Sequence, residues 1–382
     1  MHILIAPNAF KNSLPAPDAA KAIREGLMDS GLQCDIECFP VGDGGDGTAS
    51  LIVQHLGGFF THVRASDPLG RKINASLGFI DEGETAVLEM ADVSGLKLLQ
   101  SHEYNPMRAT SFGCGELIRA ALNREAKKII LGVGGSATVD GGCGALQAMG
   151  VRFLDASGNE LKGIPGSLTE LQAIDISGID NRIFKTEFII LCDVDNFLLG
   201  PKGAASVFGP QKGASENDVI QLENALTKLR DISFIQTGSD LDKLRYGGAA
   251  GGISAGLHVY LNAKLVQGID YFLETTGFDK ALENTDILIT GEGSIDLQTL
   301  EGKGPLGVAR RAKKKNIMVI GLAGEVLSGD ITELNEYFDV LIAVNPPTED
   351  LKTAMIHTSA NLRRSSMELG KMIAGGILKT RQ

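Results

Sequence analysis

The chain has 382 residues, a formal net charge of −11 at pH 7 and 43% hydrophobic residues, which is enough apolar material for two domains with separate cores. Charged residues make up 22% and the mean hydropathy is close to zero, so the composition excludes a disordered chain and a membrane protein. The negative charge argues against nucleic acid as the main partner, although a local basic pocket for an acidic small molecule is compatible with it.

The N-terminus and the cysteine pattern both indicate a cytoplasmic protein. Residues 2–7 form only a short strand-like stretch, and no charged-then-apolar leader opens the chain. The five cysteines are odd in number and include no C-x-x-C pair, so neither a disulfide framework nor a zinc site is expected. We therefore expect a cytoplasmic protein without a membrane partner.

The two ends of the chain carry the same alternation of apolar strands and amphipathic helices. Near the N-terminus the order is strand, helix, strand, which predicts a βαβ unit with a buried parallel sheet. These segments are residues 3–6, 18–28 and 35–39. Near the C-terminus the order is strand, helix, strand, strand. Those segments are residues 286–290, 306–315, 317–322 and 340–344.

The middle of the chain begins with closely spaced strands that leave no room for helices between them. These strands are residues 60–64, 72–79 and 85–90. We therefore predict an α/β protein in which a doubly wound, Rossmann-like parallel-sheet domain is interrupted by a second α/β domain with a mixed sheet. The first domain would comprise residues 1–65 and 275–382 and the second residues 66–274, with the active site in the cleft between them.

Five glycine-rich turns interrupt the chain, and each also carries an acid, a lysine, a serine or a threonine. They are residues 42–47, 132–144, 200–213, 247–256 and 291–304. The second turn follows an apolar strand over residues 128–133 and opens an amphipathic segment that ends near Met149. A glycine-rich turn between a strand and a helix start is suited to phosphate, because free backbone N–H groups face the anion there.

Two other interpretations of this turn remain open. Gly132, Gly134 and Ala137 fit the G-x-G-x-x-[GA] fingerprint of dinucleotide-binding proteins, and Asp155 closes the next apolar run, as a nicotinamide cofactor would require. Against this, three glycines within residues 141–144 lie where the helix of that fingerprint should be well formed, and Asp155 opens what looks like a hairpin turn. Alternatively, the glycines serve only the close packing of a helix on a sheet.

Acidic residues follow three of the apolar strands. Asp43 comes after the second strand, and Glu292 and Asp296 come after the predicted strand at residues 286–290. Asp193 and Asp195 are two residues apart at the end of a strand, so both side chains should lie on one face, a geometry suited to a metal ion or a general base. Lysines in polar turns could neutralise phosphate or carboxylate. They are Lys11, Lys202, Lys212 and Lys303.

Seven motifs run along nearly the whole chain. They are IAPNAFKNSL at 5–14, GDGGDGT at 42–48, GGSATVDGG at 134–142, CDVDN at 192–196, VFGPQKG at 207–213, GAAGG at 248–252 and TGEGSID at 290–296. In this order they resemble the type-1 bacterial glycerate kinase family. The resemblance implies a two-domain α/β enzyme that uses ATP and Mg²⁺ to phosphorylate D-glycerate, and it favours the 2-hydroxyl over the 3-hydroxyl.

The chain departs from the family's motifs at four positions. The family usually has Asp-Ser where this chain has Asn8-Ala9, Asn where it has Val139, and often Arg or Lys where it has Ser294. These positions bear on substrate preference and turnover.

The resemblance and the chemistry of the reaction together give a hypothesis about individual residues. Phosphoryl transfer depends on alignment and charge neutralisation, while a cation holds the substrate carboxylate and a base receives the hydroxyl proton. The catalytic candidates are Asp193, Asp195, Asp43 and Lys11, and Asp193 and Asp195 would also hold Mg²⁺. The ATP-binding candidates are Gly134, Gly135, Ser136, Thr138 and Lys303, and the glycerate-binding candidates are Ser13, Asp296 and Glu292. Base and metal ligand remain interchangeable among Asp43, Asp193 and Asp296.

Two rival functions stay open. One is an oxidoreductase that binds NAD through Gly132, Gly134, Ala137 and Asp155. The other is a non-catalytic protein that binds or senses a sugar acid, which would not need so many carboxylates. The expected partners are D-glycerate and ATP, without nucleic acid or membrane, and the expected state is a monomer or a homodimer.

Overall fold

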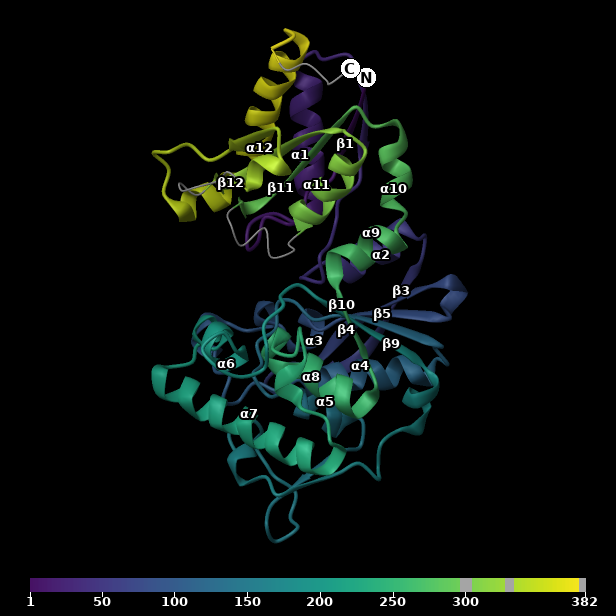
Figure 1. The fold of residues 1–382 in the computed structure, drawn as a ribbon, viewed down its shortest axis with the longest axis vertical. Coiled ribbons are helices and arrows are strands. Elements are labelled where there is room, and N and C mark those ends of the chain that lie inside the picture. The colour runs from purple at the N-terminus through teal and green to yellow at the C-terminus, as the bar shows by residue number, and fades with distance from the viewer. Residues whose placement is uncertain (296–303, 327–332, 378–382) are drawn as a thin grey trace. The chain divides into compact units, whose positions relative to one another are not determined.

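The computed structural model describes residues 1–295, 304–326 and 333–377, and the chain divides into two compact units (Figure 1). The first unit comprises Met1–Asp43 and Ile269–Gln382, and the second unit is the continuous segment Gly44–Gly268. The domain limits expected at residues 65 and 275 stay a prediction. None of the helices in the described residues has the length and apolar character that crossing a membrane requires.

The first unit is built on a parallel sheet with the strand order β13-β12-β11-β1-β2. Its strands are β1 (His2–Ile5), β2 (Asp35–Cys38), β11 (Ile287–Ile295), β12 (Met318–Val326) and β13 (Val340–Ala343). The central strands form because short runs of Ile, Leu and Val suit a sheet covered on both faces. In the register, Ile3 lies beside both Ile36 and Ile287. The predicted parallel sheet, assembled from both ends of the chain, is confirmed.

Helices cover both faces of this sheet. The helices in the described part of this unit are α1 (Ala16–Asp29), α9 (Gly268–Thr275), α10 (Phe278–Ala281), α11 (Gly304–Lys314) and α12 (Leu351–Ala374). The β1-α1-β2 and β11-α11-β12 connections run in opposite directions along the sheet, so right-handed crossovers place α1 and α11 on opposite faces. α12 packs on α1, and the two helices approach closely at Gly26, where a Cβ would lie 2.2 Å from the Arg363 carbonyl oxygen.

The strand order creates a switch point between β1 and β11. The chain leaves β1 toward β2 on one side and leaves β11 toward β12 on the other side. In open parallel sheets, ligands bind where the connections diverge in this way, at the carboxyl ends of the strands. The residues that follow β1 and β11 therefore hold the position in the first unit where a ligand is expected.

The second unit contains a mixed sheet with the strand order β10-β9-β6-β5-β4-β3. Its strands are β3 (Phe59–Ser66), β4 (Lys72–Ile80), β5 (Thr85–Glu89), β6 (Lys128–Gly132), β9 (Glu187–Cys192) and β10 (Lys264–Gln267). β3, β4 and β5 pair antiparallel, whereas β5, β6, β9 and β10 pair parallel. The predicted mixed sheet is confirmed. A separate antiparallel pair consists of β7 (Arg152–Leu154) and β8 (Ala173–Asp175).

The helices of the second unit are α2 (Thr48–His55), α3 (Ala91–Ser94), α4 (Phe112–Asn123), α5 (Cys143–Ala148), α6 (Ala204–Phe208), α7 (Glu216–Thr237) and α8 (Ala249–Leu261). The helix expected to open directly from the second glycine-rich turn begins only at Cys143. Gly135, Gly141 and Gly142 have φ values of 71°, 62° and 78°. These left-handed conformations interrupt a right-handed helix, so the residues between β6 and α5 form a long irregular loop.

The position of Asp155 argues against the dinucleotide interpretation. Asp155 follows β7, a strand of the small antiparallel pair, and not a strand of a parallel sheet. Its Oδ1 accepts hydrogen bonds from the backbone N–H groups of Ser157 at 2.8 Å and Asn159 at 2.9 Å. The carboxylate therefore stabilises its own hairpin turn, as the sequence around it suggested, and does not occupy the place of a ribose ligand.

Candidate active site

Lys11 lies at the tip of a tight turn that follows β1. The turn is closed by two backbone hydrogen bonds between Phe10 and Leu14, each 2.9 Å long, and Asn12 takes a left-handed φ of 60° within it. Phe10 is buried and anchors the turn, whereas Lys11 is exposed. A Cβ on Gly293 would lie 3.6 Å from the Lys11 backbone nitrogen, so the turn sits beside the end of β11. The ammonium group is therefore presented to solvent near the switch point.

Asn8 and Asp43 are joined by a hydrogen bond at the same end of the sheet. Asn8 Nδ2 donates to Asp43 Oδ2 at 2.7 Å, while Asn8 Oδ1 accepts from the Ala9 N–H at 2.9 Å. Asn8 is only 8% exposed and lies against the start of α11, where a Cβ on Gly304 would approach its Nδ2 to 2.8 Å. The amide that replaces the family's usual acid thus orients Asp43 without placing a second negative charge beside it.

The other candidates of the first unit divide into three groups. Glu292 lies on β11 and is buried. Ser13 Oγ lies 2.6 Å from both the Met355 carbonyl oxygen and Thr358 Oγ1, so its hydroxyl fastens the turn after β1 to α12. Asp296 and Lys303 lie outside the described residues. The described residues therefore bring Asn8, Lys11, Asp43 and Glu292 to the ends of β1, β2 and β11.

The ATP-binding candidates of the second unit lie in the loop after β6. A Cβ on Gly134 would lie 2.4 Å from Gly45 Cα, and the Gly134 N–H donates to the Gly44 carbonyl oxygen at 2.9 Å. The absence of a side chain at Gly134 therefore has a packing reason, whether or not the loop also binds phosphate. Gly135 follows with its left-handed φ of 71°.

Lys212 fixes the next part of this loop. Its Nζ donates to Ser136 Oγ at 2.8 Å and to the Thr138 carbonyl oxygen at 2.7 Å, and the residue is only 2% exposed. The sequence pointed to Lys212 only as one of four lysines in polar turns that could neutralise phosphate or carboxylate, and did not predict that it binds this loop. Its signal was the VFGPQKG motif, which places a lysine where a short 3₁₀ turn, Pro210–Lys212, ends in Gly213. A buried lysine at such a turn needs acceptors from another segment.

Asp140 caps α5 from within the loop. Its buried carboxylate accepts hydrogen bonds from the N–H and Oγ of Ser111, both at 2.8 Å, and from the N–H groups of Gly142 at 3.0 Å and Gly144 at 3.2 Å. Burial raises the pKa of Asp140, although these hydrogen bonds act against it. The N–H groups of Gly142 and Gly144 at the start of α5 are therefore already bound by Asp140 and not by a phosphate group.

Asp193 and Asp195 follow β9 and do not belong to it. The strand ends at Cys192, so the alternation of side chains along a strand does not place both acids on one face. Asp195 Oδ2 lies 3.7 Å from an Nη of Arg245, and the Asn196 side chain donates to the Lys202 carbonyl oxygen at 2.7 Å. The acids remain at the carboxyl end of a central parallel strand. Cys192 is buried, and burial raises the pKa of its thiol, which fits a packing role.

Glu89 is a further residue at these strand ends that the sequence did not single out. It is the last residue of β5, it is 4% exposed, and its Oε1 accepts a hydrogen bond from the Gly47 N–H. The available signal was an acid that closes a short, otherwise apolar strand, which is the pattern that drew attention to Asp193.

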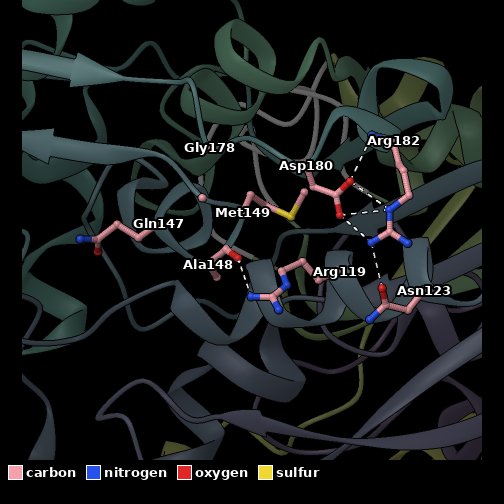
Figure 2. Close-up of a pocket in the computed structure, with 9 residues that line it drawn as sticks. Arg119, Asn123, Gln147, Ala148, Met149, Gly178, Asp180 and Arg182 are labelled. Atoms are coloured by element: carbon pink, nitrogen blue, oxygen red, sulfur yellow. Dashed lines mark hydrogen bonds and ion pairs between the residues drawn. The ribbon is translucent and has the colours of Figure 1, made fainter.

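A separate surface pocket of about 310 Å³ lies in the second unit and contains none of the predicted site residues (Figure 2). Arg119 donates to the Ala148 carbonyl oxygen at 3.1 Å, and Arg182 donates to the Leu122 carbonyl oxygen at 3.1 Å and pairs with Asp180. Both guanidinium groups thus bind carbonyl oxygens at the ends of α5 and α4, which accounts for their presence without a ligand.

Comparisons with known proteins agree along the full chain. A model of the Glycerate kinase family matches residues 3–374. A glycerate kinase of Bacillus subtilis is 41% identical over 98% of each chain, and a glycerate 2-kinase of Escherichia coli is 39% identical over 99% of each. A crystal structure from Salmonella typhimurium LT2, assigned as glycerate kinase 2, is 38% identical, covers 99% of both chains and superposes with a TM-score of 0.81. The chain therefore belongs to the glycerate kinase family.

Proposed function

We propose that the protein transfers the γ-phosphoryl group of ATP to D-glycerate, with the 2-hydroxyl as the favoured acceptor. The observation that carries this proposal is the similarity, over 99% of both chains, to the Escherichia coli relative named glycerate 2-kinase. The Bacillus subtilis relative supports the same substrate. The position of Asp155 in a hairpin turn argues against the rival oxidoreductase.

The first unit supplies groups suited to glycerate, which carries one carboxylate and two hydroxyls. In this proposal Lys11 binds the carboxylate, because it is an exposed cation at the switch point of a parallel sheet. Asp43, oriented by Asn8, accepts the proton of the reacting hydroxyl. Glu292 and Asp296 would bind the remaining hydroxyl. Ser13 would contribute by holding the turn that carries Lys11, because its hydroxyl already bonds to α12.

The second unit supplies groups suited to the nucleotide. Backbone N–H groups of residues 134–138 would bind the phosphates, with the loop fixed by Lys212 and with Lys303 as a further cation. Asp193 and Asp195 fit an Mg²⁺ ion, because the ion prefers oxygen ligands and is usually held by one or two carboxylates together with substrate phosphates. Neutralisation of phosphate charge is the chemistry that an ion at these acids would supply. Asp193 remains an alternative to Asp43 as the base.

A coupled assay of ADP release tests the proposal. Purified protein is supplied with D-glycerate, ATP and Mg²⁺, and parallel reactions omit glycerate or replace ATP with NAD. We expect ADP release that depends on glycerate, and phosphorus NMR should identify 2-phosphoglycerate as the product. NADH formation would support the oxidoreductase instead. Saturable glycerate binding without turnover would support a binding protein.

A further inference from the structure

Two acids of the second unit, Glu89 and Asp46, lie side by side: Glu89 Oε1 accepts a hydrogen bond from the N–H of Gly47, the residue that follows Asp46. Glu89 ends β5 and is almost completely buried, whereas Asp46 lies on the segment Gly44–Gly47, which we call the glycine loop. Two ionised carboxylates side by side repel each other, and burial disfavours the charged form, so such a pair is more stable when one acid is protonated. The arrangement therefore favours a pair that carries one proton.

The surroundings place that proton on Glu89. Lys97 Nζ donates to Asp46 Oδ1 and to Asp92 Oδ1, both at 2.8 Å, which stabilises Asp46 as the charged partner. Burial first, and then Asp46 and Asp92, raise the pKa of Glu89 well above its usual range, while the Gly47 N–H acts in the opposite direction. Burial alone would raise the pKa of Asp46, but Glu89 and Lys97 beside it lower that pKa overall.

Glu89 therefore acts on the glycine loop through both of its oxygens. One oxygen accepts from the Gly47 N–H, and a proton on the other oxygen would be available for donation to the neighbouring Asp46. An ionised carboxylate has only acceptors and cannot do both. The neutral acid thus joins two successive residues of the glycine loop to the end of β5.

The glycine loop lies against the ends of two neighbouring strands of the same sheet. A Cβ on Gly44 would lie 2.8 Å from the Leu191 carbonyl oxygen near the end of β9, and the Gly44 carbonyl oxygen accepts from the Gly134 N–H after β6. Gly135 is also close, because a Cβ there would lie 3.6 Å from Asp46 Cβ. A displacement of the glycine loop would therefore alter the residues proposed to bind ATP.

We propose that Glu89 is a positioning residue that, as an uncharged acid, holds the glycine loop against the strand ends and thereby keeps residues 134–138 in the conformation that binds ATP. The effect of Glu89 on ATP binding rests on the proposed function. The proton on Glu89 rests only on the contacts of the second unit, so either part of the proposal can be wrong while the other is right.

The variants Glu89→Gln and Glu89→Met separate this role from a simple packing role. A glutamine side chain can accept from Gly47 and donate to Asp46, as the neutral acid does, whereas methionine can do neither. By calorimetry, we expect Glu89→Gln to keep the wild-type affinity for ATP within about twofold, and Glu89→Met to weaken it about tenfold or more, as for a lost buried hydrogen bond. Binding of D-glycerate should change less in both variants.

Infrared difference spectroscopy tests the proton directly, without any assay of activity. At neutral pH the wild-type protein should show a carboxylic acid C=O band that Glu89→Gln lacks. The matched control is Glu116→Gln, because Glu116 also accepts from a backbone N–H, that of Ser66, but pairs with Lys72 and has a lowered pKa. The control should leave the acid band and the ATP affinity unchanged.

The pH dependence of stability gives a third measurement. With a raised folded-state pKa, Glu89 binds its proton more tightly in the folded than in the unfolded chain, so stability falls as the pH rises above the unfolded pKa toward the folded pKa. Glu89→Gln has no such proton to lose. The free energy of unfolding of this variant, relative to that of the wild type, should therefore increase as the pH rises. The inference is overturned if Glu89→Gln loses ATP binding as severely as Glu89→Met, or if the acid band is the same in wild type and Glu89→Gln. A retained band difference in a protein without kinase activity would overturn the proposed function alone.

Discussion

The variant Gly134→Ala tests whether close packing explains the glycine after β6. The added Cβ would lie 2.4 Å from Gly45 Cα and 3.1 Å from the Gly44 carbonyl oxygen. Carbon atoms pack at about 3.5–4.0 Å, so one of the two backbone segments must move by about 1 Å or more. Overpacking of this kind costs about 1–3 kcal/mol. The lower entropy of the unfolded alanine chain offsets only about 0.4–1 kcal/mol of that cost.

Gly132→Ala is the matched control, because it makes the same substitution two residues earlier. A Cβ on Gly132 would lie 3.4 Å from the Gly44 carbonyl oxygen, which is an ordinary contact distance, and its φ is not left-handed. The entropy effect is common to both variants, so their difference in unfolding free energy should equal the packing cost, about 1–3 kcal/mol. Urea unfolding should be followed by circular dichroism, because the chain contains no tryptophan. Equal stability of the two variants would refute the packing explanation.

Three further substitutions test the site. Asp193→Asn should lower turnover by about 100-fold or more, the usual scale for a positioned acid or charge-stabilising group, and near-normal turnover would remove Asp193 from the catalytic residues. Asn8→Asp removes the amide that donates to Asp43 and places a like charge beside it, so kcat/KM should fall about tenfold or more if Asp43 is the base, and an unchanged kcat/KM would argue for another base. Asp140→Asn should destabilise the protein by about 1–3 kcal/mol in urea unfolding, because an amide nitrogen at Oδ2 cannot accept from Ser111, whereas unchanged stability would mean that the loop rearranges.

The sheets could be predicted from the sequence because their signals are local. Short runs such as Ile3–Ile5 and Ile287–Ile289 are apolar and rich in β-branched isoleucine, and the lack of helix-length segments between residues 60 and 90 marked the antiparallel part. The resemblance to a known family then added the activity. Both kinds of signal can be read without knowing which distant segments touch.

The detailed roles of the site residues could not be predicted in the same way, because they depend on contacts between distant segments. Lys212 bonds to Ser136, 76 positions away, and Ser13 bonds to α12, 345 positions away at Thr358. Asp43 was recognised as a possible base, but the bond from Asn8 that orients it has no signature in the sequence. Only the fold determines whether a polar residue in a turn faces a substrate or a neighbouring loop.

The parallel sheet of the first unit has a consequence for synthesis of the protein. β1 pairs with β11 through Ile3 and Ile287, so the N-terminal strands are translated 284 residues before their central partner. At about 5–20 residues per second, that interval lasts roughly 15–60 s. The second unit is continuous in sequence and can fold on the ribosome during this time. During this time one edge of β1 has no partner strand, and an unpaired edge can pair with other chains. The nascent β1-α1-β2 segment is therefore exposed to aggregation. We expect it to need a chaperone more than the rest of the chain does.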